Sequence, residues 1–158
     1  FSTLEVPAGA LADELAALFG GTDATVTTTD DFVTAAWRKL VSNVTASPMT
    51  ALTRQRLGVM RRPDIQQLAT GLAAECLRVA AAHGAALDPD HAAAMMAGVA
   101  TTNPDMGSSM LYDRLAGRPM EHDALTGAVV RGGLATGIPT PLNEAVLALL
   151  CAISDGHT

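Results

Sequence analysis

The chain has 158 residues, of which 49% are apolar and only 3% aromatic, and its formal net charge is −6. An alanine-rich, aromatic-poor composition of this length favours one domain of closely packed helices over a β-sandwich. The acidic balance argues against a nucleic-acid surface, which needs clustered lysine and arginine. The longest apolar run, at residues 145–153, is too short to cross a bilayer. We therefore expect a mainly α-helical protein that binds neither nucleic acid nor membrane.

The first 29 residues predict a small mixed unit. Residues 1–9 predict a short strand, residues 10–21 have helical periodicity with a glycine stop, and residues 22–31 alternate β-branched side chains as a strand does. A strand–helix–strand segment of this size is too short to be a domain. We therefore assign residues 1–29 to the end of a nucleotide-binding domain or to an interdomain segment, and residues 30–158 to a helical domain.

From residue 30 onward the pattern is helical. Asp30 or Asp31 can cap a helix that extends to about Ala46. Pro48 should end this helix, because the residue before a proline is pushed out of the α region, and a short helix over residues 49–57 should follow. The expected apolar face of the first helix consists of Phe32, Ala36, Leu40 and Val44.

Proline and glycine signals predict five further helices. They cover residues 61–84, 88–103, 108–117, 119–137 and 140–154, with Asp88 and Thr140 as expected caps. The glycines of residues 132–137 fall at a helix end, so we reject them as a phosphate-binding loop. Four methionines are expected to fill the core, namely Met95, Met96, Met106 and Met110.

The cysteines and histidines predict neither a disulfide nor a metal site. Cys76 and Cys151 lie in apolar helical patterns without CxxC spacing, so we expect buried reduced thiols and a cytoplasmic protein. The four histidines show no HxxxH or HExxH spacing. We therefore expect no bound metal.

Two pairs of polar residues are candidates for chemistry. Lys39 is the only lysine beside nine arginines, and Asn43 follows four residues later, so both lie on the same face of a helix. A lysine there could donate a proton and an asparagine could bind a substrate oxygen, although a solvated helix edge explains the spacing equally simply. Ser109 and Glu121 likewise satisfy the ordinary rules for a helix cap and for a first-turn glutamate.

Two blocks, "WRKLVSN" at residues 37–43 and "SSMLYDRLAGRPMEHD" at residues 108–123, followed by "GIPTP", resemble the C-terminal domain of ketopantoate reductases (2-dehydropantoate 2-reductases). The resemblance covers most of the chain. It implies NADPH-dependent reduction of ketopantoate to pantoate, on the route to pantothenate and coenzyme A. It also implies an N-terminal Rossmann domain, with substrate in the cleft between the two domains. We therefore expect a longer native product, of which this chain is an inactive C-terminal piece that begins with a remnant of the Rossmann domain.

Carried over by motif, the resemblance assigns five site residues. Lys39 would be the general acid that protonates the ketone oxygen, and arginine would serve poorly there because its pKa exceeds about 12. Asn43 would orient the substrate, Ser109 would bind its carboxylate, and Glu121 would hydrogen-bond its hydroxyl end. Ser47 would be a second substrate-binding position, at which the family often carries asparagine.

Two alternatives stay open at this point. The serine at position 47 is shorter than asparagine, so the substrate could be a different 2-oxo acid. The chain could also be a non-enzymatic helical domain that serves binding or dimerisation, since its apolar helices could pair between two copies.

Overall fold

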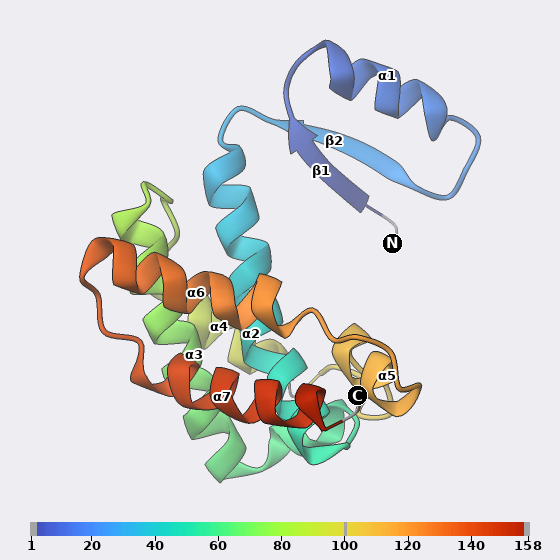
Figure 1. Cartoon of the computed structure of the whole chain (residues 1–158). Coiled ribbons are helices and arrows are strands. Elements are labelled where there is room, and N and C mark those ends of the chain that lie inside the picture. Colours follow the sequence, from blue (N-terminus) through green and yellow to red (C-terminus); the bar gives the residue numbers. More distant parts are fainter. Residues whose placement is uncertain (1–2, 100, 157–158) are drawn as a thin grey trace.

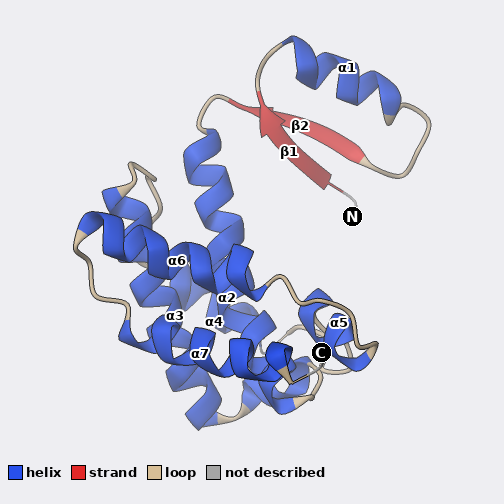
Figure 2. Ribbon diagram, in the orientation of Figure 1, coloured by secondary structure: helices blue, strands red, loops and turns tan. Residues whose placement is uncertain are grey.

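The computed structural model describes residues 3–99 and 101–156. At the N-terminus, β1 (Thr3–Pro7) and β2 (Thr25–Thr29) pair in parallel, with Thr3 opposite Thr25 and Pro7 opposite Thr29, and α1 (Ala10–Leu18) connects them. Figures 1 and 2 show this small β–α–β unit standing apart from the other helices, with α2 leading from it into them. The predicted strand–helix–strand segment is confirmed.

The rest of the described chain is helical. The elements are α2 (Phe32–Thr53), the 3₁₀ helix η1 (Leu57–Arg61), α3 (Pro63–Ala82), α4 (His91–Val99), α5 (Ser109–Leu115), α6 (His122–Thr136) and α7 (Pro141–Asp155). They pack into one bundle in which α2 and α3 contact most of the others (Figure 1). The expected fold class, mainly α with a short mixed lead-in, is confirmed.

Helix α2 does not end before Pro48, and that prediction was wrong. Asp31 caps the helix by accepting the Thr34 N–H at 3.0 Å, which lowers the pKa of the Asp31 carboxyl, and the helix continues to Thr53. A proline inside a helix removes one hydrogen bond and crowds the preceding turn. The turn around Pro48 is buried in the bundle, so packing outweighs this local cost. The expected separate helix over residues 49–57 is replaced by the last turn of α2 and the start of η1.

Three other helix starts differ from the sequence prediction. The Asp88 side chain accepts the Asp90 N–H at 2.8 Å, and this local turn delays α4 until His91. Helix α6 starts at His122, three residues after Pro119. Helix α7 starts at Pro141 as predicted, but the Thr140 hydroxyl donates to Glu144 Oε1 at 3.1 Å instead of accepting a backbone N–H.

The core consists of two clusters that share α2 and α3. One lies between these helices, η1, α5 and α7, and the other between them, α4 and α6. Met110 is buried as predicted and Met95 and Met96 are partly buried, whereas Met106 is 53% exposed because it lies in the loop before α5. Of the predicted apolar face of α2, only Val44 is fully buried. Phe32 is 43% exposed, so this part of the face is not core.

Cys76 and Cys151 are free thiols, as predicted, and burial raises the pKa of Cys76 to about 12. Cys76 is fully buried, while Cys151 is partly accessible. Across the described residues, none of the helices combines the length and the apolar character needed to cross a lipid bilayer.

Candidate active site

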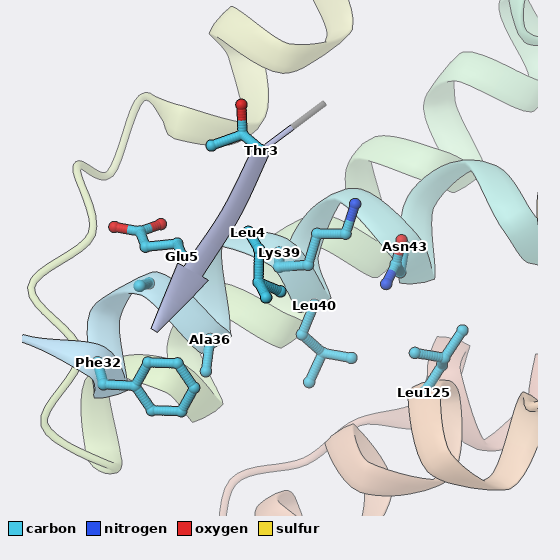
Figure 3. Close-up of a pocket in the computed structure, with 10 residues that line it drawn as sticks. Thr3, Leu4, Glu5, Phe32, Ala36, Lys39, Leu40, Asn43 and Leu125 are labelled. Atoms are coloured by element: carbon cyan, nitrogen blue, oxygen red, sulfur yellow. The ribbon is translucent and has the colours of Figure 1, made fainter. Parts of the chain in front are cut away.

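A cavity of about 550 Å³ lies where the β–α–β unit meets the helical bundle (Figure 3). Three elements line it. Strand β1 contributes one wall, α2 contributes a second, and α6 contributes a single leucine on the facing side. The lining residues are Thr3, Leu4, Glu5, Phe32, Ala35, Ala36, Lys39, Leu40, Asn43 and Leu125.

Lys39 and Asn43 both lie in the wall of this cavity. They are one turn apart on α2, and Figure 3 shows them next to each other, with the amine of Lys39 on the side of Asn43. Lys39 is exposed and Asn43 is half-buried. An ammonium and a carboxamide can each donate hydrogen bonds to a carbonyl or carboxylate oxygen. The structure therefore joins these two predicted site residues in one cavity.

The remaining wall is largely apolar, which suits the body of a small organic ligand. Phe32, Leu40 and Leu125 supply most of it, and Leu4 closes the side formed by β1 (Figure 3). Pockets for small molecules commonly combine such a wall with a few polar groups that fix orientation. Sequence periodicity assigned Phe32 and Leu40 to the core, because it cannot distinguish a side chain that faces the core from one that faces a cavity.

Strand β1 also brings a carboxylate to the cavity. Glu5 lines the cavity and forms an exposed ion pair with Arg38 of α2, with 3.7 Å between Oε2 and Nη1. Sequence reasoning missed the contribution of β1 altogether. A contact between residue 5 and residue 38 leaves no mark on local periodicity, so no local signal could have revealed it.

Ser47 lies one turn beyond Asn43 but is not among the residues that line the cavity. Its side chain is only 6% exposed, and its backbone carbonyl accepts the Thr50 hydroxyl at 3.0 Å. The buried position of Ser47 reflects the continuation of α2 through Pro48, which carries this turn into the bundle.

Ser109 is the first residue of α5 and is exposed, and it does not line the cavity either. The cap of this helix is its neighbour Ser108, whose side chain accepts the Leu111 N–H at 3.1 Å. The capping explanation offered by the sequence therefore applies to Ser108 and not to Ser109. Ser108 also hydrogen-bonds Thr50 at 2.7 Å, which places the start of α5 against α2.

Glu121 occupies the N-cap position of α6, and its side chain makes no capping hydrogen bond. It is exposed, and its carbonyl accepts the N–H of Leu125 at 3.0 Å. Residues four apart share a helix face, so Glu121 lies one turn from the leucine that lines the cavity. Its carboxylate is thus near the α6 side of the cavity without being part of its lining.

The described residues were also searched for groups that could hold a metal ion. No three histidine, cysteine, aspartate or glutamate side chains come together among them. In the same part of the chain, the turn from β1 into α1 is Ala8-Gly9, which lacks the GxGxxG pattern of a dinucleotide-binding loop. The residues present therefore do not supply a pyrophosphate site.

Comparison with known proteins identifies close relatives. Residues 31–154 match the family "Ketopantoate reductase PanE/ApbA C terminal". The chain is 44% identical over 155 residues to 2-dehydropantoate 2-reductase from Mycobacterium tuberculosis, covering 98% of this chain and 52% of that protein. It is 40% identical over 149 residues to the enzyme of the same name from Caulobacter vibrioides, covering 94% and 51%. The chain thus spans about half the length of the curated relatives it matches.

The solved structures agree with the sequence match. Dimeric ketopantoate reductase from Staphylococcus aureus superimposes with a TM-score of 0.91 and 25% identity, over 100% of this chain and 55% of that one. The fold, the two sequence blocks and the family match all point the same way. The chain belongs to the ketopantoate reductase family and carries that family's C-terminal helical domain.

Proposed function

We propose that this chain is the substrate-binding half of an NADPH-dependent reductase that converts ketopantoate (2-dehydropantoate) to pantoate. The observation that carries the proposal is the common cavity of Lys39 and Asn43, which places an ammonium and an amide against an apolar wall of suitable size. The names of the relatives supply the reaction, and membership of a family of reductases implies a nicotinamide cofactor.

Lys39 is assigned the role of general acid. Reduction of a ketone builds negative charge on its oxygen, and a positioned cationic donor stabilises that charge and delivers the proton. Help of this kind accelerates a reaction on the order of 10²–10⁴-fold. Asn43, one turn away on the same wall, orients the substrate by hydrogen-bonding one of its oxygens.

Three further residues are assigned to the rest of the substrate. Ser109 binds the carboxylate and Glu121 binds the hydroxyl end, and Ser47 is kept as a substrate-binding position. Ser109 and Glu121 are both exposed near elements that border α2 or the cavity, which supports their assignment. Ser47 is 6% exposed, so its hydroxyl would contact substrate only if the turn at Pro48 opens.

The nicotinamide cofactor is assigned to a different part of the protein. The β1–α1 turn carries no glycine-rich loop, and the curated relatives are about twice as long as this chain. We therefore assign residues 1–29 to the end of a nucleotide-binding domain and residues 30–158 to the substrate-binding domain. Pairing of two copies is a further part of the proposal, supported by the dimeric enzyme from Staphylococcus aureus.

The test is NADPH oxidation by the complete protein in the presence of ketopantoate, with other 2-oxo acids and NADH as alternative reactants. Turnover with ketopantoate is expected, and Asn43→Ala should raise the KM for ketopantoate by about tenfold through loss of one hydrogen bond. The Arg38→Ala protein is the control, because Arg38 is exposed and does not line the cavity. A complete protein that reduces no 2-oxo acid with either nucleotide would contradict the proposal.

A further inference from the structure

We infer that Thr50 and Ser108 act as positioning residues that hold Ser109 in place for substrate binding, an inference that rests on the proposed function. The two hydroxyls are 2.7 Å apart and come from positions 58 residues apart in the sequence. They join the second half of α2 to the start of α5. Neither residue was singled out by the sequence patterns.

The direction of each hydrogen bond follows from the partners. The Thr50 hydroxyl donates to the Ser47 carbonyl at 3.0 Å and also lies 3.2 Å from the Ala46 carbonyl. Its one proton is therefore committed, so Ser108 donates to Thr50. Ser108 in turn accepts the Leu111 N–H at 3.1 Å. The result is a continuous chain of hydrogen bonds from α5 through two hydroxyls to the turn of α2 that contains Ser47.

This chain is protected from water, which makes it effective as a link. Thr50 is fully buried, and Met110 and Leu111, which follow Ser109, are each 1% exposed. A hydrogen bond in such surroundings meets little competition from solvent, and leaving one member unpaired is costly. The start of α5 is therefore fixed by both polar and apolar contacts.

The other end of α5 is also attached to α2. Arg114 Nη1 donates to the Ala51 carbonyl and, at 3.0 Å, to the Leu52 carbonyl, and so caps the end of α2. Helix α5 is thus held to α2 at both ends. Between these two attachments, Ser109 is left exposed, free to contact a ligand.

The link also has the right location for a positioning role. Thr50 lies eleven residues after Lys39, about three turns along α2, and at 100° per residue it falls on the same face. Asn43 lies on that face between them. Thr50 and Ser108 therefore place the start of α5 at the end of the row formed by Lys39 and Asn43.

The chain offers a matched control for the removal of Thr50. Thr53 is also on α2, is also partly buried, and its hydroxyl donates to the Met49 carbonyl at 2.7 Å. Thr50→Val and Thr53→Val each remove one hydroxyl that bonds back to its own helix. Only Thr50→Val also removes the link to α5. Thr50→Ser keeps the hydroxyl and should restore the link.

The experiment measures steady-state kinetics of the complete protein with ketopantoate and NADPH, and amide hydrogen exchange at Leu111. For Thr50→Val we expect a KM for ketopantoate raised by about tenfold, an unchanged KM for NADPH, and faster exchange at Leu111. We expect Thr53→Val and Thr50→Ser to retain the wild-type values of all three quantities.

The two parts of the account fail in different ways. If the wild type turns over but Thr50→Val and Thr53→Val change the KM for ketopantoate equally, the positioning role is wrong and the proposed function stands. If the wild type reduces no 2-oxo acid, the proposed function is wrong and the positioning role is lost with it, whatever hydrogen exchange reports.

Discussion

Glu75 ties α3 to the first turn of α7, and its removal should destabilise the protein strongly. Its carboxylate is 3% exposed and accepts three hydrogen bonds, from the Leu142 N–H at 3.0 Å, the Asn143 N–H at 3.0 Å and the Asn143 side-chain amide at 2.8 Å. The first N–H groups of a helix have no partner within the helix. Glu75 therefore provides from α3 the cap that Thr140 does not provide from its own chain segment.

The cost of Glu75→Ala can be worked out from these contacts. A hydrogen bond to a charged group contributes about 1.5–3 kcal/mol, and the variant leaves three buried donors unpaired. Part of this loss is recovered because a carboxylate no longer has to be buried, which leaves about 3–5 kcal/mol. For a chain of this size, such a loss lowers Tm by about 10 °C or more. Glu75→Gln keeps one acceptor but turns a donor toward the helix end, and should cost about 1–3 kcal/mol.

The assay is thermal and urea unfolding followed by circular dichroism, with Glu144→Ala as the control. Glu144 lies in the first turn of the same helix but is exposed and accepts only the Thr140 hydroxyl. Its removal should cost less than about 1 kcal/mol. If Glu75→Ala and Glu144→Ala unfold within 1 kcal/mol of each other, on the order of a single neutral hydrogen bond, the assignment of Glu75 as the cap of α7 is refuted.

Two further predictions concern the thiols and the glycines. Because burial raises the pKa of Cys76 to about 12, its thiol should not react with a disulfide reagent at pH 8 in the folded protein, and Cys151 should react first; reaction of both at one rate in folded protein would contradict this. Gly133→Ala should destabilise by about 1–3 kcal/mol, because its Cβ would lie 2.7 Å from the Ile138 carbonyl oxygen. Gly98→Ala, whose Cβ would meet no atom within 4 Å, should be neutral or stabilising, and equal losses in urea unfolding would show the reasoning to be wrong.

Local patterns in the sequence were sufficient for the helical class and for the pairing of Lys39 with Asn43, because a spacing of four residues determines a shared helix face. The same patterns misplaced the end of α2. Pro48 is a strong local signal, but the burial of its turn depends on residues distant in the sequence. Periodicity also assigned Phe32 to the core, since a cavity wall and a core show the same spacing.

Long-range contacts account for what sequence reasoning could not supply. The wall formed by β1, the bond between Thr50 and Ser108, and the cap that Glu75 gives to α7 each join residues that are far apart in the chain. The family resemblance supplied Ser109 as a site residue, whereas helix grammar alone could not separate it from the adjacent cap.

The account depends most on Lys39 as the proton donor, and the kcat of the complete protein with ketopantoate and NADPH tests this directly. Lys39→Ala and Lys39→Arg should both fold, because the side chain is exposed at the cavity wall, and both should lower kcat on the order of 10²–10⁴-fold. The arginine variant keeps the charge but transfers a proton poorly. A Lys39→Ala protein with undiminished kcat, or a Lys39→Arg protein that matches the wild type, would contradict the central claim.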